Sequence, residues 1–314
     1  MRYFDKEQVE RLLDMGGCIN AMRKALTQYS LGSAVQVLRT AMPFAPGKIL
    51  GVMPAALPDS GLVGAKLITV FPGNFQKGLP SHQGVVALFS AQDGSLQTIL
   101  DAEAITGIRT AAVSAAVTDA LARRDAHILC MMGSGLQARK HLEAMLLVRS
   151  VDEVRVWDVN EDSALRFKAE MEAKWNVKVI DCCRNAESAV RGADIICTVT
   201  SSPEPILFGA QLSPGVHINA VGACGAANRE LDAEAVRRSR LYCDSRESCM
   251  SEAGDFLIPL KNGEVQPEQL LGEIGLVFAG KLKGRQNTTD ITLFEAQGLA
   301  VEDLAAAGYV MERC

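Results

Sequence analysis

The chain has 314 residues, of which 48% are hydrophobic and 22% charged, a balance typical of folded proteins and unlike that of disordered chains. This length exceeds one ordinary hydrophobic core and predicts about two domains. The formal net charge of −5 argues against a nucleic-acid-binding surface, because binding phosphates requires a basic face.

The composition also argues against export and membrane insertion. Apart from its one histidine, the segment 205–228 carries no acidic or basic side chain, but its Gln, Ser, Pro and Asn residues do not fit a membrane span. The N-terminus, MRYFDKEQVERLLD, is charged where a signal peptide needs an apolar run. The nine cysteines are odd in number and show no zinc-type spacing. We therefore expect a cytoplasmic protein with reduced thiols and no metal site.

The first third of the chain predicts a helix followed by a sheet. Apolar residues recur at helical spacing over 4–31, which predicts one opening helix. Short apolar runs separated by Pro, Gly, Asp and Asn then predict an antiparallel meander, with strands at 35–44, 48–57, 62–71, 84–90 and 96–101. Residues 102–124 are rich in alanine and predict a long helix, interrupted near Gly107.

After residue 125 the pattern alternates between strands and helices. Strands are expected at 127–132, 153–158, 177–181, 193–199, 217–221, 240–244 and 290–294, and helices at 135–149, 161–174 and 186–191. This alternation predicts a Rossmann-type, doubly wound parallel sheet with helices on both faces. No linker-like segment stands near residue 112, so we expect two packed domains that share a helix there.

A glycine-rich motif, residues 133–138, lies between a predicted strand and a predicted helix. It fits G-x-G-x-x-A and comprises Gly133, Ser134, Gly135, Leu136, Gln137 and a final alanine. The first glycine permits a tight turn, the second lets the backbone approach a pyrophosphate, and the small last residue lets the helix pack on the sheet. The first N–H groups of the helix would then bind the phosphates of a dinucleotide.

An acidic residue, Asp158, ends the next predicted strand. An acid at this place accepts hydrogen bonds from the ribose of NAD and repels the 2′-phosphate of NADP. The sequence therefore favours NAD(H), although Arg155 and Arg166 keep NADP(H) possible. The alternative interpretation of Asp158 is a cap for the helix that follows.

Small residues end two later strands, where the crevice of a doubly wound sheet opens. Thr198 lies at the end of one strand, Val221 lies at the end of the other, and Gly222 follows it. We include them as candidate cofactor contacts, but ordinary turn chemistry explains each of them equally well.

Three cations stand among apolar or small residues of the first domain. Arg39 and Lys66 fall in predicted strands and Arg109 in the alanine-rich helix. Burying each would be costly without an anionic partner. Two arginines can grip one carboxylate, and a desolvated lysine can exchange protons near neutral pH. Taken singly, each is better explained as a rim residue or as part of an ordinary ion pair. The sequence has no HExxH, GxSxG or Cys/His motif for metal hydrolysis or acyl transfer.

Six blocks of sequence carry a resemblance to a known family. They are LGVMPA (50–55), PSHQ (80–83), ITGIRTAAVSA (105–115), GSGLQA (133–138), EPILFG (204–209) and PGVHINAVGA (214–223). Together they resemble the ornithine cyclodeaminase/mu-crystallin family, most closely its ketimine reductase branch. The resemblance implies an α+β substrate-binding and dimerisation domain at 1–112 with 298–314, a Rossmann domain at 113–297, and a homodimer.

The resemblance also implies roles for single residues. Arg39 and Arg109 would clamp the substrate carboxylate, and Lys66 would lie beside the reacting nitrogen and carbon. Met53 and Cys224 would line the substrate site, and Thr110 would contact the cofactor. The implied reaction is the NAD(P)H-dependent reduction of Δ1-pyrroline-2-carboxylate or Δ1-piperideine-2-carboxylate to L-proline or L-pipecolate.

Two departures from the family bear on the alternatives. Cyclodeaminases carry an aspartate after the VGA-type strand and a glutamate before the Met-Pro pair, whereas this chain has no acid over 223–226 and has Gly51 at the second position. Ornithine cyclodeaminase, an amino-acid dehydrogenase such as alanine dehydrogenase, and a non-catalytic ligand-binding crystallin-like protein remain alternatives. His82 and His217 are interpreted as structural, Asp290 is left open, and no role is assigned to Cys182, Cys183 and Cys314.

Overall fold

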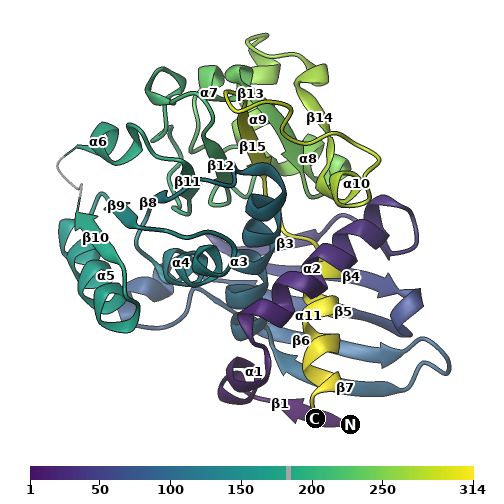
Figure 1. Cartoon of the computed structure of the whole chain (residues 1–314). Coiled ribbons are helices and arrows are strands. Elements are labelled where there is room, and N and C mark those ends of the chain that lie inside the picture. Colours follow the sequence, from purple (N-terminus) through teal and green to yellow (C-terminus); the bar gives the residue numbers. More distant parts are fainter. Residues whose placement is uncertain (182–184) are drawn as a thin grey trace. The chain divides into compact units, whose positions relative to one another are not determined.

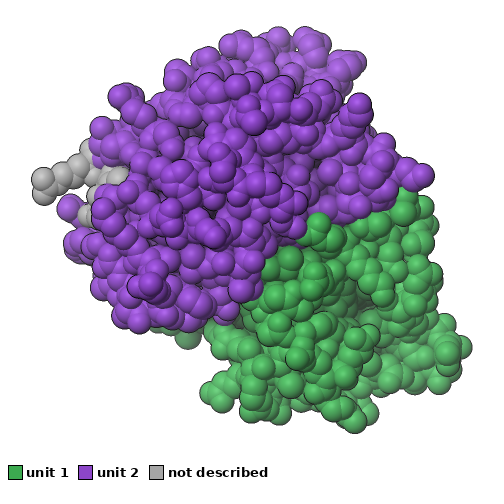
Figure 2. Space-filling view, viewed as in Figure 1, with its two compact units in different colours: residues 1–113, 298–314 green, residues 114–297 purple. Residues whose placement is uncertain are grey.

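The computed structural model describes residues 1–181 and 185–314 and divides into two compact units (Figure 2). Unit 1 comprises Met1–Val113 and Gly298–Cys314, and unit 2 comprises Ser114–Gln297. The helix α3 (Ala102–Leu121) begins in unit 1 and ends in unit 2. Cys182 and Cys183 lie outside the described residues.

The described part of unit 1 contains a seven-stranded sheet in the order β1-β7-β6-β5-β4-β2, with β3 also paired to β4. All pairs are antiparallel except β1 and β7, which are parallel. The strands are β1 (Arg2–Phe4), β2 (Val35–Gln36), β3 (Thr40–Ala45), β4 (Lys48–Leu57), β5 (Leu62–Val70), β6 (His82–Ser90) and β7 (Leu96–Asp101). The predicted antiparallel meander is therefore confirmed, and β1 is a strand that the sequence did not predict.

Three predictions for unit 1 were wrong in detail. The expected helix over 4–31 is two helices, α1 (Lys6–Leu12) and α2 (Met15–Ser30), because the side chain of Asp14 caps α2 by accepting from the Gly17 N–H at 2.7 Å. The expected strand over 35–44 is broken, and Arg39 lies in the break between β2 and β3. Helix α3 continues through Gly107, since buried neighbours such as Ile105 and Ile108 offset the roughly 1 kcal/mol that a helical glycine costs.

One face of this sheet is covered by helices. Helix α11 (Ala300–Glu312) packs on β4, β5 and β6 and lies beside α2 (Figure 1). Side chains alternate between the two faces of a strand, so the buried residues of β5 are Gly64, Lys66 and Ile68. Lys66 is thus a charged residue on the covered face of a sheet.

The described part of unit 2 contains an eight-stranded sheet in the order β10-β9-β8-β11-β12-β15-β13-β14. Every pair in it is parallel. The strands are β8 (Ile128–Met132), β9 (Glu153–Trp157), β10 (Lys178–Asp181), β11 (Ile195–Thr198), β12 (His217–Ala220), β13 (Ser239–Cys243), β14 (Leu270–Glu273) and β15 (Ile291–Glu295). The chain order reverses between β8 and β11, which confirms the predicted doubly wound α/β fold.

The helices of unit 2 follow the predicted alternation over its first half. The α-helices are α4 (Leu136–Val148), α5 (Glu161–Lys174), α6 (Ala186–Val190), α7 (Ala233–Arg238), α8 (Arg246–Glu252), α9 (Gly254–Lys261) and α10 (Ile274–Phe278). Short 3-10 turns lie at η1 (Pro58–Ser60) and η2 (Pro72–Lys77) in unit 1 and at η3 (Gly209–Gln211) and η4 (Pro267–Gln269) in unit 2. Strand β14 and the helices from α7 onward were not predicted. Over the described residues, no helix is long and apolar enough to cross a membrane.

Candidate active site

A buried ion pair links the sheet of unit 1 to its C-terminal helix. Lys66 Nζ lies 2.7 Å from Asp303 Oδ2, and the two side chains are 3% and 0% exposed. Lys66 is held at the centre of the sheet by its cross-strand neighbours Met53 on β4 and Val86 on β6. Asp303 lies in the first turn of α11. The pair therefore joins segments that are far apart in the sequence.

Arg109, on α3, extends this pair into a network. Its Nε lies 2.9 Å from Asp303 Oδ1, and its Nη1 lies 2.8 Å from Glu302 Oε2. Glu302 also accepts from the Leu299 N–H at 3.1 Å. Lys66 and Arg109 are thus bridged by the two oxygens of one carboxylate.

Arg39 completes the cluster through the backbone that precedes α11. Its Nη2 donates to the Gly298 carbonyl at 3.1 Å. Gly298 has φ +76°, and a Cβ there would lie 2.9 Å from Arg109 Nη1. A glycine is therefore needed at this position for both its conformation and its space. Lys66, Arg39, Arg109 and Met53 are brought together in unit 1.

The cluster carries more positive than negative charge. Lys66, Arg39 and Arg109 supply three cations, while Glu302 and Asp303 supply two carboxylates. Burial, with help from the Arg109 and Arg39 charges, lowers the pKa of Lys66 to about 8, although Asp303 opposes the shift. Burial acts to raise the pKa of Asp303, but Arg109 and Lys66 outweigh it and the pKa falls below its usual range. The network is suited to bind one further anion and to exchange a proton near neutral pH.

The sequence did not single out Glu302 and Asp303. Two adjacent acids in the otherwise apolar segment 299–310 were the available signal, because buried acids need partners. Each is fully buried. They supply the anionic partners of Lys66 and Arg109.

The covered face of the sheet beside Lys66 is apolar, and we call this part of it the apolar floor. Met53 is 5% exposed, and Gly51 lies opposite Ile68 on the same covered face. Thr110 follows Arg109 on the α3 segment of unit 1. Position 51, where cyclodeaminases are expected to carry a glutamate, therefore has no side chain.

In unit 2, the glycine-rich motif forms the turn between β8 and α4. Gly133 has φ +106°, and a Cβ there would lie 2.9 Å from the Val199 carbonyl. The loops after β8 and β11 therefore meet at the point where the strand order reverses. A Cβ at Gly135 would meet no atom within 4 Å, so the loop is open there. Leu136 and Gln137 begin α4, and Ala138 is fully buried against the sheet.

Asp158 lies beside this loop and binds it. Its Oδ2 accepts from the N–H and the hydroxyl of Ser134 at 2.9 and 2.6 Å. Its Oδ1 accepts from the Asn160 N–H at 2.8 Å, but the residue that caps α5 is Asn160. Arg155 donates from Nε to Glu153 Oε1 and from Nη1 to the Arg191 carbonyl, each at 2.6 Å. The acid is therefore placed at the glycine-rich motif, and Arg155 binds other groups.

The residues after β11 and β12 are held by a buried glutamate. Glu230 accepts from the Thr200 N–H and hydroxyl and from the Gly222 N–H, at 2.7, 2.6 and 2.9 Å. Thr198 is fully buried, and its carbonyl accepts from the Val221 and Gly222 N–H groups. Glu230 was not predicted, because a single acid in a loop gives no local signal of burial.

Cys224 lies in unit 2. Its thiol is exposed and donates to the Val221 carbonyl at 3.7 Å. The structure therefore places it with the β12 loop.

The remaining candidates have structural surroundings. His82 contacts the Ser81 hydroxyl at 2.9 Å, and desolvation and the Lys66 charge lower its pKa. His217 is buried against Thr292, and burial lowers its pKa to about 3. Asp290 accepts from the Gln286 N–H at 2.8 Å and caps a loop. The thiol of the exposed Cys314 donates to the Val310 carbonyl of α11 at 3.3 Å.

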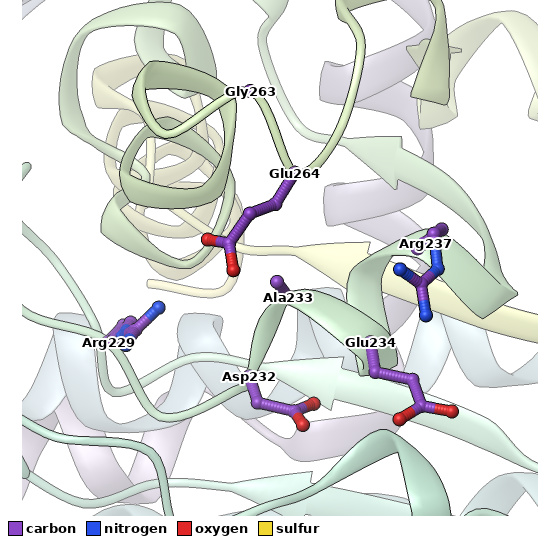
Figure 3. Close-up of a pocket in the computed structure, with 7 residues that line it drawn as sticks. All are labelled: Arg229, Asp232, Ala233, Glu234, Arg237, Gly263 and Glu264. Atoms are coloured by element: carbon purple, nitrogen blue, oxygen red, sulfur yellow. The ribbon is translucent and has the colours of Figure 1, made fainter.

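A charged hollow of about 460 Å³ lies elsewhere on unit 2 (Figure 3). It is lined by Arg229, Asp232, Ala233, Glu234, Arg237, Gly263 and Glu264. Three carboxylates face two guanidiniums, so its charge does not match an anionic ligand. Among the described residues, no group of three or more His, Cys, Asp or Glu side chains could hold a metal ion.

Curated relatives resemble the chain over nearly its whole length. The ketimine reductase mu-crystallin of Mus musculus is 39% identical over 298 residues, which cover 94% of this chain and 91% of that protein.

Solved structures also match the chain over nearly its whole length. The Δ1-pyrroline-2-carboxylate reductase of Thermococcus litoralis, in complex with NADH and L-proline, matches with a TM-score of 0.97 and 34% identity, over 100% of this chain and 97% of that one. An archaeal alanine dehydrogenase dimer with bound NAD matches with a TM-score of 0.94 and 32% identity, over 99% of this chain and 95% of that one. Both relatives bind a nicotinamide dinucleotide.

The family model described as "Ornithine cyclodeaminase/mu-crystallin family" matches residues 3–314. Such a match includes both the charged network of unit 1 and the glycine loop of unit 2. The chain belongs to the ornithine cyclodeaminase/mu-crystallin family.

Proposed function

We propose that the protein reduces the C=N bond of small cyclic imino acids with NADH, converting Δ1-pyrroline-2-carboxylate or Δ1-piperideine-2-carboxylate to L-proline or L-pipecolate. The observation that carries the proposal is the buried network in which Asp303 bridges Lys66 and Arg109. A proton donor and a carboxylate-binding group thus lie side by side. The reductase and pyrroline-2-carboxylate reductase relatives support the same reaction.

Unit 1 binds the imino acid. Its carboxylate pairs with Arg39 and Arg109, because the cluster has one positive charge more than negative. The apolar floor at Gly51, Met53 and Val86 suits a hydrocarbon ring and offers nothing to a distal ammonium group. Fixing the planar imine by its carboxylate lowers the entropic part of the barrier.

Lys66 supplies the proton. With a pKa of about 8, its side chain is mostly an ammonium at neutral pH and can protonate the imine nitrogen. A positively charged nitrogen draws electrons from the adjacent carbon, which makes that carbon a better hydride acceptor. NADH, when bound, supplies the hydride.

Unit 2 binds the dinucleotide. The space at Gly135, the tight turn at Gly133 and the N-terminus of α4 fit a pyrophosphate. Asp158 beside Ser134 favours the unphosphorylated ribose of NAD(H), and NADP(H) is the weaker ligand. Gly222 and Val221 belong to the same edge of the sheet and are further candidate contacts.

The test is a spectrophotometric assay of NADH consumption with each imino acid, run in parallel with NADPH. The expected result is faster oxidation of NADH, with formation of L-proline or L-pipecolate measured by chiral chromatography. Absence of turnover with both imines and both cofactors would overturn the proposal.

A second candidate is oxidation of a linear amino acid such as alanine, which the archaeal alanine dehydrogenase favours. Its signature is stoichiometric NADH formation from L-alanine. Cyclodeamination of ornithine is disfavoured by the absence of a carboxylate at Gly51 and over 223–226. Its signature is ammonia release from ornithine with catalytic amounts of NAD.

We also propose that unit 1 forms a homodimer. The sheet face opposite to Lys66 carries exposed apolar side chains, among them Leu67 at 42%, Met42 at 50% and Phe44 at 53%. An exposed sheet face with several large apolar side chains favours an interface. Sedimentation should give a mass near twice that of the chain, and Leu67→Glu should yield monomers. A wild-type monomer at micromolar concentration would contradict the dimer.

A further inference from the structure

Asp303 uses both carboxylate oxygens to join the two groups that matter most for the proposed reaction. Oδ2 lies 2.7 Å from Lys66 Nζ, and Oδ1 lies 2.9 Å from Arg109 Nε. The Asp303 side chain is fully buried, so water does not screen these interactions as it would at the surface. The carboxylate therefore fixes the ammonium and the guanidinium relative to each other.

We propose that Asp303 is a positioning residue, which sets the spacing of Lys66 and Arg109 and keeps Lys66 protonated so that it can donate to the substrate nitrogen. The proposal rests on the proposed reduction of imino acids. It assigns to the C-terminal helix a part in catalysis, although Asp303 acts through its two partners.

The charges around Lys66 show why Asp303 is needed. Burial lowers the pKa of Lys66, and the charges of Arg109 and Arg39 lower it further, whereas Asp303 raises it by both charge and hydrogen bonding. His82 on β6 interacts electrostatically with Lys66 and would add a like charge if protonated. Glu302 contacts Arg109 and the Leu299 N–H instead. Without Asp303, Lys66 would be a buried amine beside two guanidiniums and would lose its proton more readily.

The backbone around α11 makes this arrangement rigid. Asp303 lies in the first turn, next to Glu302, whose carboxylate binds the N–H of Leu299 at the start of the helix. The helix packs against β4, β5 and β6. A small movement of the helix start would therefore change the spacing of Lys66 and Arg109.

The first experiment compares pH profiles of kcat and kcat/KM for imine reduction in the wild type and Asp303→Asn. The alkaline limb, where Lys66 loses its proton, should move at least one pH unit lower in the variant. At pH 7.5, kcat should fall tenfold or more while KM for NADH stays within twofold. An alkaline limb that does not move would overturn the proposal.

Glu302→Gln is the matched control, since it removes the neighbouring acid, whose Oε2 lies 2.8 Å from Arg109 Nη1. We expect a higher KM for the imine but an alkaline limb at the wild-type pH. Asp303→Glu keeps the charge and lengthens the side chain by one methylene. It should keep the wild-type limb while kcat falls, which separates the control of charge from the control of position. An Asp303→Glu limb shifted as far as that of Asp303→Asn would contradict the charge argument.

A measurement without turnover separates this inference from the proposed function. The protein is labelled with [¹³Cε]lysine, and the Lys66 signal is assigned by its loss in Lys66→Arg. Its chemical shift, followed by NMR over pH 6–10, should titrate at least one unit lower in Asp303→Asn than in the wild type. If the wild type fails to reduce imines but this shift appears, only the proposed function fails. Unchanged titration with normal turnover overturns the role of Asp303.

Discussion

Two buried aspartates, one in each unit, face opposite surroundings. Asp303 in unit 1 is paired with Lys66 and Arg109. Asp255 in unit 2 is equally buried, but its Oδ1 accepts from the Glu230 and Leu231 N–H groups, both at 2.7 Å. Its charged neighbours include the buried carboxyl of Glu230.

Their acidities diverge as a result. Burial and the Glu230 charge raise the pKa of Asp255 to about 8, whereas Arg109 and Lys66 hold the pKa of Asp303 below its usual range in spite of burial. The surroundings of Asp303 therefore favour its carboxylate form, and those of Asp255 favour its protonated form. The charged partner, and not burial alone, therefore decides which form of a buried side chain is favoured.

The largest expected effect is on the free energy of unfolding, when each of the two aspartates is replaced by asparagine in turn. Asp303→Asn leaves two buried cations short of an anion and should lower the free energy of unfolding by about 3–5 kcal/mol. Because the fold raises the pKa of Asp255, the wild type must keep a proton on this group when it folds at pH 7. Asp255→Asn has a neutral group of the same shape and should therefore not lower the free energy of unfolding at pH 7. Urea unfolding of the two variants measures both. Equal losses would contradict the assignment of opposite charge states.

The next effect concerns Lys66. Lys66→Met removes the proton donor but leaves Asp303 paired with Arg109, so turnover of the imine should fall at least about a hundredfold. Binding of NADH, followed by its fluorescence, should change little. Lys24→Met, at an exposed lysine of the same unit, is the matched control and should keep wild-type turnover. Retained turnover in Lys66→Met would remove Lys66 from the proposed mechanism.

A smaller effect concerns the pH dependence of stability, to which Asp255 of unit 2 contributes. The folded-state pKa of Asp255 lies above the unfolded value of 3.8, so the folded protein binds one more proton between these values, and its contribution to stability falls as pH rises toward about 8. Asp255→Asn has no such group. The wild type should therefore lose stability relative to the variant by about 1.4 kcal/mol for each pH unit between pH 5 and 7. Parallel curves of unfolding free energy against pH would show that Asp255 is ionised in the fold.

The smallest effect concerns the choice of cofactor. Asp158→Ser removes the negative charge beside Ser134, so the ratio of kcat/KM for NADH over NADPH should fall about tenfold, which corresponds to about 1.4 kcal/mol. Steady-state kinetics with both cofactors measures the ratio. Asp162→Ser, at an exposed acid in the first turn of α5, is the control and should leave the ratio unchanged. A wild-type ratio in Asp158→Ser would assign cofactor choice to other residues.

Local patterns of the sequence were sufficient for most of the architecture. The short apolar runs became β4, β5, β6 and β7, and the alternation after residue 125 became the parallel sheet. Predictions were wrong where a single residue outweighed a periodic pattern, as at Asp14, which starts a second helix. They were also wrong where buried neighbours outweighed a single residue, as at Gly107 in α3.

By itself, the sequence determined the fold class, the glycine turn at Gly133 and the acid that follows the next strand, because each depends on spacing along a short segment. The tertiary structure alone decided that Lys66, Arg109 and Asp303 form one network, since Arg109 and Asp303 are 194 residues apart. It also decided that Asp303 is charged. The pKa of a buried acid depends on which groups the fold places against it, and no local pattern carries that information.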